Sequence, residues 1–479
     1  MAQQYAADHL MQSLIGKLYQ ILTGGDDVAA PASDNFIAWC TPGIPFDTAD
    51  FDFASKGLAG QTGDETRRLL ATASDFSRLV NFVPDPSGIF NKEQQDTTLE
   101  QSGTLIWNVY KNVLQFSEVA AGQLTDAEKA KLEKFRNLLR TTKTVTNIVT
   151  DETSEVTVDG PVLEAYNAKM ADYLDAVTEY NNKRISAMNS DDPLIVQDWA
   201  LNSSNYRRRV KVANDAWISG GYKNEVDQMN AYIDQVTKRD LTLLKADLQD
   251  TFDRGKLTDL VSGADFWNTT VIPGGFAAKS GWSQFSFSQD NVSSYESSET
   301  NSWSAGASYG RFLFGASGST SGSITKEFSS LDTSNFKMSF EVVQVPISRP
   351  WFSPEFLKNT AWRWAQNSGM SPLSDGNKPP AGQLVAYPST AVFVRNIQMD
   401  FKELHQTESD FRSHITAKTS VGWGPFKVSG SYTRDKHTHS FNSTVGEQGL
   451  VVPGMQLIAL KCSLLPKAPN PSPDVTDWN

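Results

Sequence analysis

The chain has 479 residues, a formal net charge of −12, and 39% hydrophobic residues, with aromatic residues making up 11% of the chain. This apolar content is enough for packed cores and excludes a chain that is disordered throughout. The acidic balance argues against nucleic acid as a partner, because phosphate binding requires a basic surface. It also excludes long-range attraction to anionic lipid, so any membrane contact would have to be hydrophobic or guided by a receptor.

The N-terminal region does not resemble a signal peptide, because residues 1–22 lack a basic segment and place Asp8 and His9 early. No run approaches the roughly 18 uninterrupted apolar residues of a transmembrane helix. Cys40 and Cys462 have apolar neighbours and are predicted to be two buried thiols in a reducing compartment. We therefore expect synthesis in the cytoplasm without a signal peptide. Action at a target membrane would then require release by lysis or by a dedicated machine.

Residues 1–265 are predicted to form an antiparallel α-helical bundle. Thr125 and Glu128 have the spacing of a capping box, and Pro161 suits a first helical turn. The Thr/Val-rich segment 144–160 is predicted to connect helical layers, with a small hairpin as one way of doing so. Apolar residues recur at three- and four-residue spacing in segments 10–22, 65–83, 98–119, 132–139, 161–177 and 226–248.

The composition changes near Pro273, where Ser, Thr, Gly and aromatic residues replace Leu, Lys and Glu. We place a domain boundary there and predict an α+β protein, in which a mainly antiparallel β domain over 281–462 follows the helices. This domain is predicted to hold two long Ser/Thr-rich hairpins joined by an aromatic and proline-rich connection. The hairpins are assigned to 281–346 and 389–462, and an extended tail to 463–479.

The first hairpin turns at Gly310-Arg311. Before this dipeptide the apolar residues have odd numbers, and after it they have even numbers. A two-residue hairpin requires that shift, because the residues flanking the turn point to the same face. Tyr309 is therefore predicted to face Phe312, and Gly310 suits the positive φ of a type II′ turn.

The second hairpin obeys the same geometry at Gly424-Pro425, where Trp423 is predicted to face Phe426 and Val421 to face Val428. Proline in the second central position matches the φ that a type II′ turn needs there. Ordinary sheet is predicted at the base of the two hairpins, in segments 283–288, 336–345, 391–401 and 454–462. Arms of about 20–25 residues on each side of a turn far exceed an ordinary strand of about six, so something must cover their apolar faces.

Candidate chemistry is sparse. No nucleophile elbow, Walker loop or HExxH motif occurs, so we predict no catalytic residue, no cofactor and no enzyme. Asp435, His437 and His439 alternate along one strand and could bind a divalent metal, but we favour a solvated polar face with ordinary cross-strand charge pairs and predict no metal site. The aromatic clusters at 349–352 and 362–364 suit either a ligand site or caps beneath a sheet, and we favour the caps.

The paired hairpins resemble β-barrel pore-forming toxins in architecture. The Ser/Thr-rich strands are similar to those of aerolysin-like proteins, and two hairpins per protomer are similar to the perforin and cholesterol-dependent cytolysin group. The resemblance covers residues 281–462 and carries over no functional residue. It implies an oligomer that inserts amphipathic hairpins into a membrane. The sequence does not specify the membrane, the trigger or the oligomer number.

Two other functions stay open. The hairpins could pair with neighbouring protomers and build a soluble ring, tube or filament. The tryptophans could serve a carbohydrate- or surface-binding module. We expect a homo-oligomer both for pore formation and for a soluble assembly. A lipid membrane is a further partner for pore formation only, and nucleic acid is expected as a partner in none of the three cases.

Overall fold

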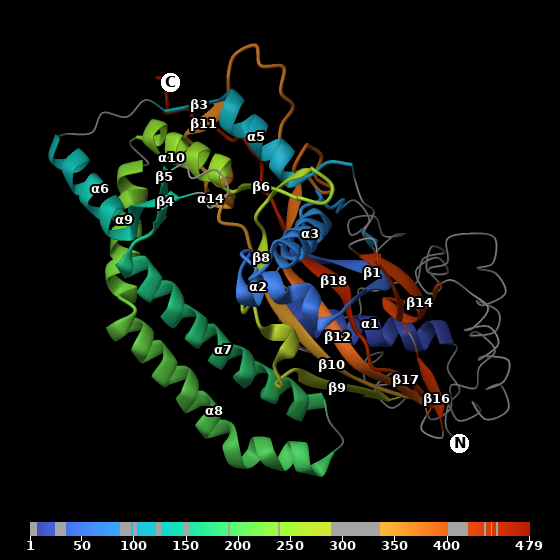
Figure 1. The fold of residues 1–479 in the computed structure, drawn as a ribbon. Helices are drawn as coiled ribbons and strands as arrows, with labels where there is room; N and C mark the ends of the chain where they lie inside the picture. Colours follow the sequence, from blue (N-terminus) through green and yellow to red (C-terminus); the bar gives the residue numbers. More distant parts are fainter. Residues whose placement is uncertain are drawn as a thin grey trace.

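A computed structural model describes most of the chain and confirms an α+β protein with helices and antiparallel sheets (Figure 1). The described residues are 7–23, 35–86, 97–98, 103–120, 126–146, 153–189, 192–237, 240–288, 336–400, 420–434, 437–441, 443–446 and 449–479. The helices are α1 (Ala7–Thr23), α2 (Asp52–Lys56), α3 (Gly63–Val80), α5 (Ile106–Phe116), α6 (Asp126–Leu139), α7 (Pro161–Asn189), α8 (Pro193–Gly220), α9 (Lys223–Thr237), α10 (Leu241–Arg254) and α14 (Pro354–Lys358), with short 3-10 turns η1 (Thr48–Phe51) and η2 (Phe276–Ala278).

The main sheet has nine strands, and long antiparallel strands dominate it. Its central neighbours run β9, β10, β12, β18 and β1. These strands and the shorter ones that extend the sheet are β1 (Asn35–Phe46), β2 (Thr97–Thr98), β8 (Thr270–Val271), β9 (Ser283–Ser288), β10 (Lys337–Ser348), β12 (Ala386–Asp400), β16 (Thr444–Gly446), β17 (Gly449–Val452) and β18 (Met455–Leu464).

Smaller sheets lie around the main one. The pair β4–β5 is the small hairpin that the Thr/Val-rich segment suggested, and the sheet β13–β14–β15 contains the second predicted turn. The strands of these sheets are β3 (Ser117–Val119), β4 (Arg140–Thr146), β5 (Thr153–Asp159), β6 (Lys256–Thr258), β7 (Asp265–Trp267), β11 (Trp362–Trp364), β13 (Ser420–Trp423), β14 (Phe426–Arg434) and β15 (His437–Phe441).

The strands predicted at the base of each hairpin pair with one another, β9 with β10 and β12 with β18. Strands β9 and β10 pair at Ser288 and Lys337, and β12 pairs with β17 at Met399 and Leu450. Lys337 is also paired with Asp400, so all four strand ends lie beside one another. The chain therefore leaves β9 and enters β10 at one end of the sheet. It also leaves β12 at this end, and β16 turns into β17 there.

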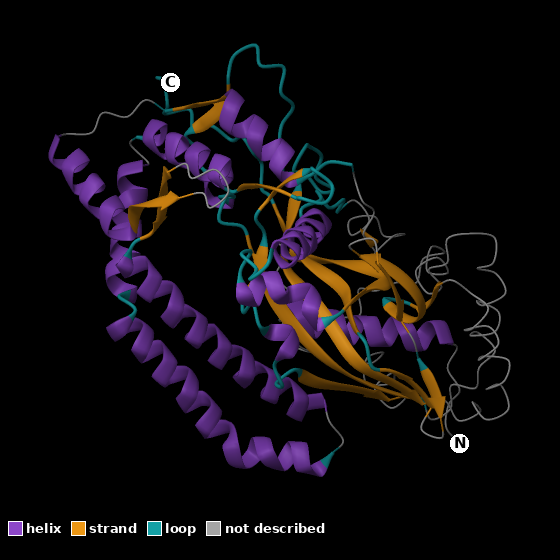
Figure 2. Ribbon diagram, viewed as in Figure 1, coloured by secondary structure: helices purple, strands orange, loops and turns teal. Residues whose placement is uncertain are grey.

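Each face of the main sheet is apolar and covered. On one face, Phe46, Phe393 and Leu457 join a large core with residues of α2, α3 and α5. On the other face, Trp39 and Phe340 pack with the apolar stripe of α1. Figure 2 shows helices against this sheet, as expected when side chains alternate between two buried faces.

The predicted N-terminal domain of helices alone differs from the structure. Strand β1 lies within the supposedly helical 1–265 and pairs with β18 along most of its length. One core also joins residues from both predicted domains, for example Phe51 with Phe393, whose ring centroids are 5.3 Å apart. Pro42 and Pro45 argue against a central strand in the sequence, because proline cannot donate a hydrogen bond to a neighbouring strand. In the structure the register shift between Trp39 and Ile44 accommodates them.

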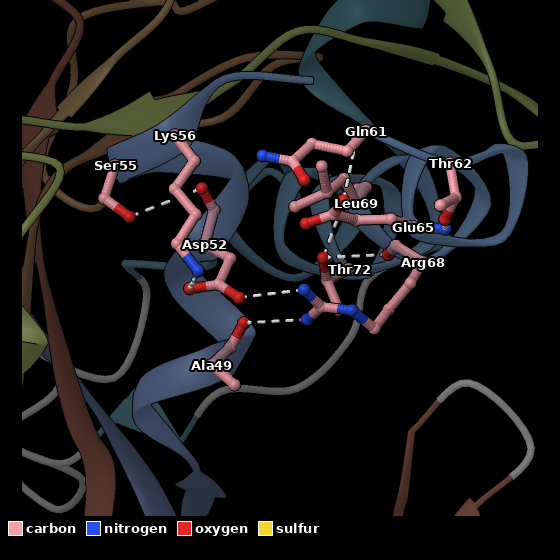
Figure 3. Close-up of polar contacts among 10 residues, drawn as sticks. All are labelled: Ala49, Asp52, Ser55, Lys56, Gln61, Thr62, Glu65, Arg68, Leu69 and Thr72. Carbon is pink, nitrogen blue, oxygen red and sulfur yellow. Dashed lines mark hydrogen bonds and ion pairs between the residues drawn. The ribbon is translucent and has the colours of Figure 1, made fainter. Parts of the chain in front are cut away.

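A cluster of polar contacts holds α3 against α2 and the preceding turn η1 (Figure 3). Arg68 Nη2 donates to Asp52 Oδ2 at 2.8 Å, and Lys56 Nζ lies 3.1 Å from Asp52 Oδ1. Burial raises the pKa of Asp52, but the hydrogen bonds from Arg68 and Lys56 outweigh it and hold that pKa below its ordinary value. Thr62 caps the helix by accepting from Glu65 N at 3.2 Å.

A second tie is the partly buried Arg349, immediately after β10. It donates to Asn81 Oδ1 at 2.6 Å, to Pro388 O at 2.7 Å and to Val80 O at 2.8 Å. Burial lowers its pKa from the ordinary arginine value. The guanidinium thus fastens α3 and β12 to the end of β10 through neutral acceptors.

Other predictions are met at this end of the molecule. Trp351 and Trp362 are buried in the larger core, so the aromatic clusters act as caps. Cys40 and Cys462 are free and buried, as predicted. The predicted tail does not project: its backbone pairs with β3, where Val119 N donates to Asn479 O at 2.9 Å.

Candidate functional site

The predicted hairpin tips are the residues to which the sequence assigned function. Tyr309, Gly310, Arg311 and Phe312 lie outside the described residues. The second tip is described and lies inside the molecule, between α1 and the main sheet, in the core that also contains Trp39 and Phe340 (Figure 1).

The turn itself has the predicted form. Trp423 pairs with Phe426, and Gly424 has a φ of 56°. The predicted pair of Val421 with Val428 is wrong, because a bulge shifts the register and Val421 pairs with Ser429. The extra residue bends the strand at this point, and sequence periodicity does not reveal it.

A buried glutamine fastens the tip to the sheet. Lys427 N donates to Gln456 Oε1 at 2.6 Å, and Gln456 Nε2 donates to Lys427 O at 3.1 Å. Gln456 lies on the central strand β18, between Val394 and Pro45 in register, and is fully buried. The side-chain amide of Gln456 takes the place of a neighbouring strand at Lys427. The backbone N–H and C=O of Lys427 are therefore both hydrogen-bonded without water.

Two glycines allow this close approach. A methyl group on Gly43 would lie 2.6 Å from the Pro425 carbonyl oxygen and also against Gln456 Oε1. A methyl group on Gly424 would lie 2.9 Å from Met11 Sδ. Backbone atoms of β1 and the tip thus meet at a distance that only glycine permits.

Helix α1 covers the site. Its residues Leu10, Met11, Leu14, Ile15, Leu18 and Leu22 are all buried in this core. Phe426 and Val428 of the tip are fully buried in the same core, and Phe426 lies 5.4 Å from Phe340 between ring centroids. Burying an apolar side chain of this size contributes about 1.5–3 kcal/mol, so α1 and the tip hold each other in place.

Lys427 departs from expectation. The predicted polar face of the second hairpin would expose its side chain, yet only 6% of the residue is exposed. Burial lowers the pKa of its ammonium group. The protein therefore keeps the cationic side chain of Lys427 buried at the tip, although exposing it to solvent would cost less free energy.

The candidate metal residues are not brought together with the expected partners. The sequence predicts an uninterrupted arm that places His437 opposite Arg412 and His439 opposite Asp410. In the structure β15 folds back on β14, so that His437 pairs with Arg434. Asp435 lies outside the described residues, and no group of three or more His, Cys, Asp or Glu among the described ones could hold a metal.

Comparison with family models, with curated proteins and with solved structures gives no match. No helix in the described parts of the chain is long and apolar enough to cross a membrane. The site therefore has to be interpreted from its own contacts.

Sequence reasoning missed Gln456 and Gly43. Gln456 interrupts the apolar run of β18, and a polar residue within a central strand is a usable signal of a buried partner. Gly43 lies between two prolines, and that context favours a loop over a strand with a close backbone approach.

Proposed function

We propose that the protein is an oligomerising, membrane-active protein that inserts its two amphipathic hairpin segments into a bilayer, in the manner of β-barrel pore-forming toxins. The observation that carries this proposal is the shared end of the sheet. The segments 289–335 and 401–443 begin beside one another, after the adjacent ends of β9 and β12 that flank the start of β10. Copies placed side by side would thus contribute four strands each to one closed barrel, and closure is what a membrane requires.

The stored tip supports the same function. Pro425, Phe426 and Val428 are buried under α1, which keeps apolar hairpin residues away from water until they are needed. The segment Ser302–Ser319 carries a single charge, Arg311, at its predicted turn. A strand pair with one apolar face and a charge only at its tip can cross lipid within a barrel.

Dye release from liposomes tests the proposal. The decisive variant combines Met11→Cys with Gly424→Cys, because these positions are in contact and a disulfide would hold the tip under α1. We expect the wild type and the reduced variant to release dye and the oxidised variant to release none. The reduced form is the matched control, since it carries the same substitutions and the same strain at Gly424.

Absence of dye release by the wild type at every pH and lipid composition would rule out membrane activity. Release by the oxidised variant at the wild-type rate would show instead that the tip need not leave its site.

A soluble assembly without membrane insertion is the second candidate. It is favoured by the acidic net charge of −12 and by an edge strand, β9, from which a sheet could continue into a neighbour. Electron microscopy of the purified protein without lipid separates the two. Rings or filaments that form fully and never release dye would support the soluble assembly.

A further inference from the structure

Strand β9 is the outer strand of the four that carry the hairpin segments. Among the described strands it pairs with β10 alone. Its other side faces the C-terminal part of α7, which belongs to a long helical arm formed with α8 (Figure 1). An edge strand is a template for another chain, so proteins usually cover it.

The cover consists of side chains that take the place of a neighbouring strand. Gln284 N donates to Ser186 Oγ at 2.7 Å, and Ser283 Oγ donates to Asn182 Oδ1 at 2.6 Å. Asn182 Nδ2 in turn donates to Gly281 O. Asn182 and Ser186 are 9% and 7% exposed, so these polar groups are buried only as long as the arm is seated. The edge is thus satisfied by hydrogen bonds that a strand could equally supply.

Apart from these hydrogen bonds, only weak contacts hold the arm to the rest of the protein. Among the side chains described in α7 and α8, only Trp217 is a buried hydrophobic residue. The ion pair between Lys279 and Asp175 joins the arm to the body, and both partners are about half exposed, so it contributes little. A cleft of about 900 Å³ lies between the arm and the sheet edge, lined among others by Glu179 and Trp282.

These contacts describe a segment that can leave without disturbing a core. Local opening is cheapest where few apolar contacts are lost, and here the losses are polar groups that water can satisfy. Neither of the two main cores contains a described residue of α7 or α8.

We propose that α7 is a removable cover of the β9 edge and that a second copy of this chain replaces it by adding a strand to β9. This inference rests on the proposed function. A second copy is the occupant because head-to-tail addition, in which the opposite edge of one sheet pairs with β9 of the next copy, aligns the ends after which the segments 289–335 and 401–443 begin. An unrelated partner at this edge would interrupt that row and prevent a closed barrel.

The test is a disulfide between Asn182→Cys and Ser283→Cys, whose native side chains are in hydrogen-bond contact. The matched control is Thr144→Cys with Glu155→Cys, which are exposed and directly opposite each other on β4 and β5, away from the contact between α7 and β9. Association of purified protein is followed by sedimentation without lipid, and dye release is followed separately. Both pairs are compared oxidised and reduced.

We expect the oxidised Asn182–Ser283 pair to remain monomeric, and the oxidised control to associate like the wild type. The reduced Asn182–Ser283 pair should associate at the wild-type concentration or below it, because it also lacks the covering bonds of Asn182. Removing the covering bonds in Asn182→Ala/Ser186→Ala should lower the concentration needed for association by about tenfold or more. Association of the locked form at the wild-type concentration, or a wild type that stays monomeric in all conditions, would overturn the inference. Association that follows the expected pattern without any dye release would uphold the inference and reject membrane insertion alone.

Discussion

Replacing Gln456 by methionine should undock the second tip and leave the rest of the fold intact. Methionine has a similar length and is acceptable in an apolar core, but it offers neither donor nor acceptor of comparable strength. The backbone N–H and C=O of Lys427 would then lose the bonds at 2.6 and 3.1 Å. The change therefore isolates the hydrogen bonds from the packing.

The magnitude follows from two opposing terms. Leaving two buried polar groups without partners costs about 1–3 kcal/mol each, or about 2–6 kcal/mol together. Burial of Phe426 and Val428 favours docking by about 1.5–3 kcal/mol each, or about 3–6 kcal/mol. The terms are of equal size, so the docked and undocked tips should become comparably populated. The larger core contains none of these residues and should be unaffected.

Amide hydrogen exchange over residues 424–434 measures this directly. We expect these amides to exchange much faster in Gln456→Met than in the wild type, while those of α3 and β18 keep their protection. Gln398→Met is the matched control, because Gln398 is an exposed residue of the neighbouring strand β12. Exchange in Gln456→Met that equals both wild type and control would refute the idea that the glutamine holds the tip.

Three further changes probe other parts of the structure. Arg349→Met should lower the free energy of unfolding in urea by about 3–5 kcal/mol, because buried acceptors lose their donor, and a loss below 1 kcal/mol would contradict this. Cys40 and Cys462 should resist thiol reagents until the chain unfolds, since burial raises both pKa values, that of Cys40 to about 12; fast modification of the native protein would disprove it. Burial raises the pKa of Asp52, but hydrogen bonds lower it overall. The Asp52 carboxylate therefore stabilises the fold at pH values above its unfolded-state pKa, and this stabilisation is lost as pH falls through its folded-state pKa. Arg68→Ala should raise the pKa of Asp52 in an NMR titration, and an unchanged value would exclude the ion pair as a cause.

Patterns of short range made much of this fold predictable. The alternation in 283–288 and 336–345 located β9 and β10, and the glycine at 424 located a turn of positive φ. Helical spacing located α3, α5 to α7, α9 and α10 to within several residues. These features depend on neighbours in sequence, and the residue types state them directly.

Features set by distant contacts were not predictable. A bulge beside Gly422 changes the register without changing the alternation. The reversal of β15 onto β14 joins two strands that both contain Ser and Thr, so composition does not mark it. Strand β1 is stable despite its two prolines because β18 pairs with it. The buried position of the second tip depends on Gln456 and α1, which lie far from it in sequence.

The two devices inferred from the structure use separate contacts, although β9 also contributes Phe285 and Phe287 to the core under α1. The tip is held by α1, β1 and β18, whereas the β9 edge is covered by α7, and the two sets of contacts share no residue. Free-energy changes at sites without shared partners usually add, so weakening one should leave the other intact. Association at the β9 edge can therefore precede release of the tip, since the apolar face under α1 stays covered when the arm leaves. That order would keep apolar hairpin residues out of water until a row of copies is ready to receive them.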